Sequence, residues 1–181
     1  MHVVRELFSA IRADLEMFMQ NDFSTKSKRE IILFSTSFRG LVYYRIYHSL
    51  YEKGHKFIAM YLYCQAKRKY GMDIYPMAKI EPGIIIDHGM GVVIGSTAFV
   101  GKGTILYHGV TLGSKKIERG KRHPIVGRNV FVGNQASILG SVKVGDNAVI
   151  GAHSVVLTDI PPHATVVGIP ARVIKIEGKN V

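Results

Sequence analysis

The sequence lacks the features of several large protein classes. It contains one cysteine, Cys64, so no disulfide can form within the chain. No apolar run reaches the roughly 18 residues that a membrane-spanning helix needs. The N-terminus carries charges at Arg5, Glu6 and Arg12 and does not have the form of a secretory signal peptide. These absences predict a cytoplasmic protein with no membrane partner.

Acidic residues are scarce relative to basic ones. The chain has 24 Lys and Arg against 13 Asp and Glu, which gives a formal net charge of +11. Such a charge suits nucleic acid, an anionic membrane or a polyphosphate cofactor. The basic residues cluster around Lys28 and in a loop at 115–122, without interleaved aromatics or a nucleic-acid-binding motif. Nucleic acid is therefore not expected as a partner, and the first cluster fits a solvated face equally well.

Aliphatic residues recur at six-residue steps from residue 80, and the next residue is glycine at seven of the twelve positions. A period of six fits neither a 3.6-residue helix nor an alternating strand. It is typical of a solenoid in which each hexad forms a short strand and a turn, and three hexads close a triangular coil. Glycine is expected to permit the tight corners. The twelve positions are Ile80, Ile86, Ile94, Val100, Leu106, Leu112, Val126, Val132, Ile138, Val144, Ile150 and Val156.

The first 70 residues contain no proline and follow a helical periodicity, as in Leu7, Ile11 and Leu15. Residues 28–67 predict two or three helices, broken near Gly40 and Gly54. The aromatic residues of this stretch are expected in a core or a subunit interface. We therefore expect a helical N-terminal segment at 1–70 that covers the open end of the solenoid. The coils would occupy 71–165, with an inserted loop at 113–125, and a C-terminal cap would occupy 166–181.

The repeat is interrupted twice, and each interruption brings polar residues out of the frame. Ile86 and Ile94 lie eight residues apart instead of six, and the sequence between them begins Asp87-His88-Gly89. The second interruption is the loop at 113–125, which ends in Arg122-His123-Pro124. A solenoid is only a frame, so the catalytic groups are expected at these interruptions. Histidine suits a general base because its free pKa is about 6.5.

Three stretches of the chain resemble serine acetyltransferases: MDIYPMAKIEPGIIIDHGMGVVIG, YHGVTLG and GKRHPIVGRNVFVGNQASILGSVKVGDNAVIGAHSVVL. The likeness extends from residue 20 to about residue 172. It implies a mainly β protein, a left-handed parallel β-helix of hexapeptide repeats with an N-terminal α-helical segment. It also implies direct transfer of the acetyl group of acetyl-CoA to the hydroxyl of L-serine. The product would be O-acetylserine for cysteine biosynthesis, with no acyl-enzyme and no metal.

The resemblance assigns His88 as the general base and Asp73 as the carboxylate that orients it. Asp87 is adjacent to His88, but neighbouring side chains of an extended segment point apart, which favours Asp73. His108 stands two places into its hexad, as His88 does, and three hexads later. Their side chains are therefore expected on one face of adjacent coils, where a second imidazole either tunes the base or is a spectator.

The resemblance also assigns the binding residues. Asp22 and Asp87 would bind the amino group of serine, Arg122 would bind its carboxylate, and His123 would line the substrate site. CoA is expected in a groove between neighbouring subunits, with the basic loop near its phosphates. The backbone contacts of CoA are expected at Gly113, Ala136 and Ala152.

Partners and alternative functions follow from the same residues. The resemblance implies a homotrimer, or a hexamer of two trimers. The C-terminal GKNV differs from the isoleucine-ended tail that docks cysteine synthase, which argues against that complex. The first alternative is an O-acetyltransferase of a sugar or surface polysaccharide, although Asp22, Asp87 and Arg122 favour a zwitterion. The second is a non-catalytic scaffold or a metal-binding trimer similar to β-helical carbonic anhydrases, although the histidines lack short metal-ligand spacing.

Overall fold

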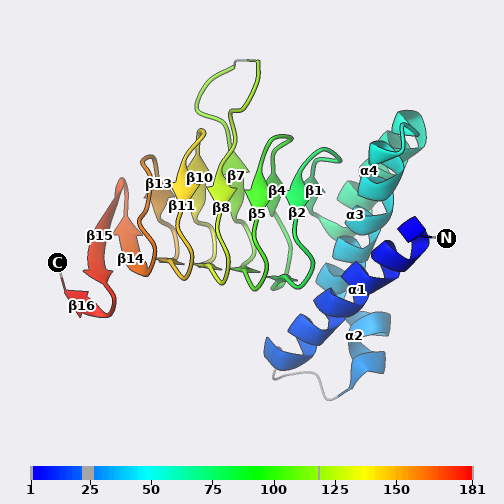
Figure 1. Ribbon diagram of the computed structural model, residues 1–181, viewed down its shortest axis with the longest axis horizontal. Coiled ribbons are helices and arrows are strands. Elements are labelled where there is room, and N and C mark those ends of the chain that lie inside the picture. The colour runs from blue at the N-terminus through cyan, green and yellow to red at the C-terminus, as the bar shows by residue number, and fades with distance from the viewer. Residues whose placement is uncertain (1, 22–26, 118, 181) are drawn as a thin grey trace.

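The computed structural model describes residues 2–21, 27–117 and 119–180. Helices occupy the N-terminal part and short strands the rest (Figure 1). The helices are α1 (His2–Asn21), α2 (Lys28–Phe34), α3 (Thr36–Glu52) and α4 (Lys56–Tyr70). None of the helices in these ranges is long and apolar enough to cross a membrane.

The strands form three sheets that are the three sides of a stack of triangular coils. Sheet A contains β1 (Asp73–Ile74), β4 (Val93–Ile94), β7 (Thr111–Gly113), β10 (Ser137–Leu139) and β13 (Val155–Val156). Sheet B contains β2 (Lys79–Ile80), β5 (Phe99–Val100), β8 (Ile125–Val126) and β11 (Lys143–Val144). Sheet C contains β3 (Ile85–Ile86), β6 (Ile105–Leu106), β9 (Phe131–Val132), β12 (Val149–Ile150), β14 (Ala164–Gly168), β15 (Ala171–Ile176) and β16 (Lys179–Asn180).

Each coil stacks on the next through parallel strand pairs, so the predicted hexapeptide solenoid is confirmed. All twelve predicted aliphatic residues are buried, with exposed fractions of 6% or less. They form three inward ladders, and burying each such side chain contributes roughly 1.5–3 kcal/mol. The ladders extend further than the sequence analysis placed them: Ile74 pairs with Ile94 in sheet A, and Val166 pairs with Ile150 in sheet C.

The glycines that follow the aliphatic residues have a different role from the expected one. None of the seven adopts a positive φ. A Cβ on Gly133 would lie 2.6 Å from the amide nitrogen of Ala152, in the next coil. Backbone of the next coil approaches comparably closely at Gly101, Gly127 and Gly145, so glycine is required at these four positions. The left-handed turn positions are instead taken by residues such as Asn129, Gln135 and Asn147, with φ between 53° and 60°.

The predicted helix break near Gly40 is wrong, whereas the break near Gly54 is confirmed. Helix α3 runs through Gly40 and begins after Ser35, whose hydroxyl caps the amide of Phe38. A Cβ on Gly40 would lie 1.8 Å from Cε of Met72. Gly40 is therefore a packing contact between α3 and the entry to β1, and it does not end the helix.

Side chains of α3 satisfy the carbonyl groups of the first coil. Amides of this coil donate to the second coil, as Asp73 does to Val92. No coil precedes it whose amides could donate to its carbonyl groups. Buried carbonyl groups need hydrogen-bond donors, so these must come from another part of the chain. The donors come from the YYRIYH stretch, each at 2.7 Å: Tyr47 hydroxyl to Ile74 O, His48 Nδ1 to Pro76 O, and Tyr44 hydroxyl to Ala78 O.

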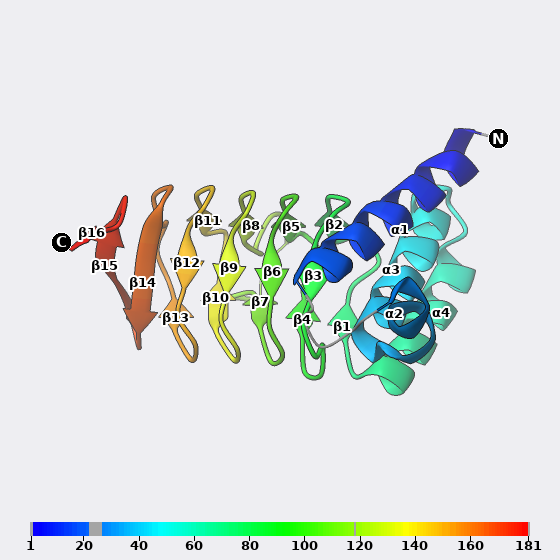
Figure 2. The same cartoon turned by 90° about the horizontal axis from the view of Figure 1, so that it is seen from below.

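A buried ion pair completes this closure and attaches α1. Arg45 and Asp14 are 5% and 1% exposed and pair through two contacts of 2.9 and 3.0 Å. Arg45 also donates to the carbonyls of Ile80 and Glu81. Asp14 accepts the amide of Gly83 at 2.8 Å, a corner amide that in later coils donates to the preceding coil. Figure 2 shows α1 lying across the first coil beside β3.

The opposite end of the stack is closed by a change of strand direction. Strand β14 continues sheet C in parallel with β12, but β15 and β16 pair antiparallel. The amide of Gly168 donates to the hydroxyl of Ser154, a buried residue of the coil before. The last coil is thus covered by a hairpin (Figure 1).

We predict that Arg45→Met lowers the free energy of unfolding by about 3–5 kcal/mol, because it leaves Asp14 as an unpaired buried charge. Urea unfolding followed by far-UV circular dichroism measures the change. Arg12→Met is the matched control: Arg12 pairs with Glu16 on the exposed face of α1, so its loss should leave the midpoint unchanged. Equal losses in the two variants would contradict the role assigned to the buried pair.

Candidate functional site

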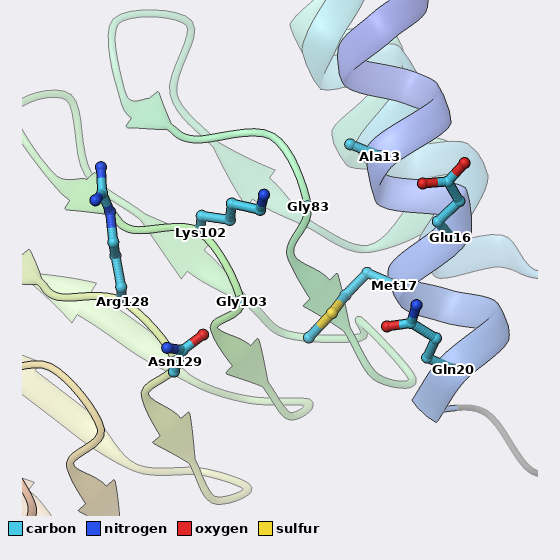
Figure 3. A pocket seen from close by; sticks show the side chains of 9 residues that line it. All are labelled: Ala13, Glu16, Met17, Gln20, Gly83, Lys102, Gly103, Arg128 and Asn129. Atoms are coloured by element: carbon cyan, nitrogen blue, oxygen red, sulfur yellow. The ribbon is translucent and has the colours of Figure 1, made fainter.

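A cavity of about 670 Å³ lies between α1 and the turns that join sheets B and C. Figure 3 shows Lys102, Arg128 and Asn129 on the coil side, facing Met17 and Gln20 of α1. Glu81 engages Arg128 through two contacts of 3.0 and 3.1 Å, and this pairing lowers the pKa of the Glu81 carboxyl. None of the predicted site residues lines this cavity, which belongs to the corner opposite sheet A.

A second cavity, of about 610 Å³, brings three predicted site residues together. It lies at the edge where sheet A turns toward sheet B. Asp73 comes from the start of β1, and Arg122 and His123 come from the end of the inserted loop. Tyr63 of α4 and Tyr75 also line it. The fold thus places a carboxylate, a guanidinium and an imidazole around one cavity.

The imidazole of His123 is held as a neutral group. Its Nδ1 accepts the amide of Thr97 at 3.2 Å and lies 2.9 Å from the Thr97 hydroxyl. That hydroxyl oxygen accepts the amides of Arg122 and His123, so its proton points to Nδ1. Nε2 therefore carries the ring proton. Burial, and then the charge of Arg122, lower the pKa of His123, so the ring is an uncharged donor at neutral pH.

Gly95 makes room for this ring. A Cβ on Gly95 would lie 2.1 Å from Cδ2 and Nε2 of His123. Any side chain at position 95 would displace the imidazole. Gly95, directly after β4, therefore leaves the space that His123 of the inserted loop occupies.

Asp73 is held by the last turns of α4. Its two carboxylate oxygens accept the hydroxyl of Tyr63 and the ammonium group of Lys67. His88, its expected partner, is not among the side chains that contact Asp73 in the described part of the protomer.

His88 lies at the other edge of sheet A, where sheet C turns toward sheet A. It is 72% exposed, and its φ is +61°. This left-handed backbone overturns the premise that residues 87 and 88 are extended. Oδ1 of Asp87 lies 3.8 Å from Nε2 of His88, which is too long for a hydrogen bond. The expected proximity of His108 is confirmed, with ring centroids 5.9 Å apart at 77°. Nδ1 of His108 is buried without a partner among the described residues.

Two of the residues expected to contact CoA follow the same edge. Ala136 and Ala152 lie in later turns between sheets C and A, whereas Gly113 ends β7 at the edge where sheet A turns toward sheet B. Ala136 is fully buried, and its carbonyl accepts the amide of Thr111, so only its second lone pair is available. In the basic loop, Lys115 donates to the carbonyl of Leu157. This contact folds the start of the loop back onto the coils.

Sequence reasoning missed Tyr63, Lys67 and Thr97, and it named one residue that lies outside the described residues. Asp22 is the residue outside. Helical periodicity located Tyr63 and Lys67 in a helix but carried no signal for the strand they face. Thr97 occupies a corner position where many residue types fit. In the described ranges, no group of three or more His, Cys, Asp or Glu side chains could hold a metal ion.

Comparison with known proteins gives consistent matches. The family model "Bacterial transferase hexapeptide (six repeats)" matches residues 123–158. Serine acetyltransferase of Synechococcus elongatus is 43% identical over 97% of this chain and 72% of its own length. That of Helicobacter pylori is 44% identical over 88% of this chain and 94% of its own.

Solved structures of serine acetyltransferases are also similar to this chain. Neisseria gonorrhoeae serine acetyltransferase superposes with a TM-score of 0.92 at 39% identity, covering 94% of this chain and 66% of that one. Its complex with serine gives a TM-score of 0.91. The chain spans 52% of the length of Arabidopsis thaliana serine acetyltransferase 2.

We predict that NMR finds His123 as the Nε2–H tautomer, titrating below the ordinary histidine range. Protonation is disfavoured in the native state, so the unfolded state takes up the proton first as pH falls below about 6.5. The free energy of unfolding therefore decreases as the pH is lowered through that range. The His123→Gln variant should lack this part of the pH dependence. A ring protonated at Nδ1, or a raised pKa, would rule out the hydrogen-bond assignment.

Proposed function

The chain belongs to the serine acetyltransferase family, and we propose that it transfers the acetyl group of acetyl-CoA to the hydroxyl of L-serine. The product is O-acetylserine, the precursor in cysteine biosynthesis. The observation that carries this function is the cavity shared by Asp73, Arg122 and His123, which complements an amino-acid carboxylate. We assign to the coils the left-handed sense of the hexapeptide acyltransferases.

The proposed active site is shared between protomers of a trimer. Within one protomer, His88 and Asp87 lie at the edge between sheets C and A, and Asp73, Arg122 and His123 lie at the edge between sheets A and B. A head-to-tail interface that closes into a ring places different surfaces of two copies in contact. Such an interface joins the His88 edge of one protomer to the Arg122 edge of the next. A homotrimer then has three sites, and the helical segment offers a surface for pairing two trimers.

The exposed imidazole of His88 is the general base. It takes the proton from the serine hydroxyl as that oxygen attacks the thioester carbonyl of acetyl-CoA. The tetrahedral intermediate collapses by breaking the carbon–sulfur bond, and the imidazolium returns the proton to the departing thiolate. Proton transfer of this kind contributes roughly 10²–10⁴ in rate. Acetyl passes directly to serine, so no acyl-enzyme forms and no metal is required.

The charges of the two edges match the ends of a zwitterion. Arg122 binds the serine carboxylate, and the Nε2–H of His123 supplies a second donor. Asp87, beside the base, binds the ammonium group, and Asp22 is proposed as a second acceptor for it. A neutral sugar offers no charge that complements Arg122 or Asp87, which disfavours the sugar acetyltransferase alternative.

Acetyl-CoA is proposed to lie along the turns that follow the His88 edge. Ala136 and Ala152 present backbone groups there, and Gly113 presents its backbone at the other edge of sheet A, where the inserted loop begins. Lys116 and Arg119 of the inserted loop supply positive charge for the CoA phosphates, although Lys115 is engaged by the carbonyl of Leu157.

We predict thiol release from acetyl-CoA that depends on L-serine and not on a panel of sugars, followed with a thiol reagent. His88→Ala should lower kcat by at least about 10²-fold, the usual contribution of a general base. His55→Ala is the control, since His55 is exposed and its side chain makes no capping bond at the start of α4. Sugar-dependent release would contradict the substrate, and full turnover by His88→Ala would contradict the mechanism.

Replacing Arg122 should separate the two substrates. We predict that Arg122→Ala raises the KM for serine by about 10–100-fold, the cost of losing hydrogen bonds to a charged group, and leaves the KM for acetyl-CoA nearly unchanged. Steady-state kinetics with each substrate varied in turn measures both constants. The control is Lys121→Ala, in the same loop. Equal effects on the two KM values would place Arg122 outside the serine site.

A further inference from the structure

Two side chains of α4 hold the carboxylate of Asp73. Tyr63 donates its hydroxyl to Oδ1, and Lys67 donates its ammonium group to Oδ2. The donors are four residues apart, so they lie on one face of the helix. Two donors on two different oxygens fix both the position and the plane of the carboxylate.

Tyr63 is itself held by the closure of the first coil. Its ring packs edge-on against Tyr47, with centroids 6.0 Å apart, and lies 5.7 Å from the ring of Tyr75. Tyr47 is buried and bonded to the carbonyl of Ile74, the residue after Asp73. Burial, and then the bond to Asp73, raise the pKa of the Tyr63 hydroxyl. Tyr63 is therefore a permanent donor on a rigid support.

We propose that Tyr63 and Lys67 are positioning residues that hold the Asp73 carboxylate in the orientation needed to support the general base. This inference rests on the proposed function, in which Asp73 faces His88 of the adjacent protomer. An ionised carboxylate has about four acceptor sites, so Tyr63 and Lys67 leave others for the imidazole N–H. The helical segment then contributes to turnover as well as to closing the coil.

A purely structural role is the competing explanation, in which the three residues only attach α4 to β1. The Lys67–Asp73 pair is poorly suited to that role. Lys67 is 52% exposed and Asp73 is 27% exposed, and ion pairs at such positions stabilise proteins little. Contacts to both carboxylate oxygens are better explained by orientation of the carboxylate.

A double-mutant cycle separates the two roles. The variants are Tyr63→Phe, Lys67→Met and Asp73→Asn, with Tyr63→Phe and Lys67→Met also made in the Asp73→Asn background. Alone, Tyr63→Phe and Lys67→Met should each lower kcat by about ten-fold, the loss expected for one hydrogen bond to a charged group, with the KM for serine unchanged. In the Asp73→Asn background neither should have a further effect, because residues that act through a shared partner are not additive.

The controls address charge and folding. Lys67→Arg retains a donor and should recover most of the activity lost in Lys67→Met. Arg68→Met removes a neighbouring cation whose guanidinium bonds only to Gln65 among the described residues, and it should leave kcat unchanged. Thermal unfolding and size-exclusion chromatography confirm that each variant is folded and assembled.

Additive losses in the Asp73→Asn background, or losses in KM instead of kcat, would overturn the inference. Wild-type turnover with L-serine is the internal reference. Its absence would contradict the proposed function and the inference with it, whereas an active wild type with an additive cycle contradicts the inference alone.

Discussion

The structure depends on satisfying the row of carbonyl groups that the first coil leaves unpaired. Every later coil receives hydrogen bonds from the one before, but the first has no predecessor. An open strand edge of this kind invites pairing with another chain. Tyr44, Tyr47 and His48 of α3 donate to these carbonyls one after another, and Arg45 completes the row with Asp14 at the corner. The helices are therefore an obligatory end to the solenoid.

The same requirement links the end of the solenoid to the proposed chemistry. Asp73 lies in β1, the strand whose carbonyl edge α3 covers, and α4 supplies the two donors that hold its carboxylate. Farther along, the inward ladders leave no room for extra residues inside a coil, so both insertions emerge at corners of sheet A. One insertion presents His88 and the other presents Arg122 and His123. Because they emerge at opposite edges of one sheet, the proposed site requires two copies of the chain.

The stacked coils of the β-helix can be predicted from the sequence, but many tertiary contacts between side chains cannot. A six-residue period of aliphatic residues predicts stacked coils because each side of a triangular coil takes six residues. Each side contributes one aliphatic residue to an inward ladder. The insertions could be located for the same reason, as failures of that count. The sequence does not show that most of the repeat glycines are required by close approach of the next coil and not by a special φ. Gly40 was misread because helical propensity is local, whereas its contact with Met72 is tertiary. Tyr63 and Lys67 could not be assigned to Asp73, since a helical pattern does not reveal which strand a face meets.

Subunit complementation tests the shared site most directly. His88→Ala and Arg122→Ala should each be nearly inactive alone. In every mixed cyclic trimer of the two variants, one interface of the three joins an intact His88 edge to an intact Arg122 edge, which is about a third of the interfaces. Co-expression with two affinity tags, followed by purification of the mixed trimers, should therefore restore serine-dependent thiol release to about that fraction of the wild-type rate. Mixed trimers no more active than the separate variants would show that each site lies within one protomer and would contradict the account.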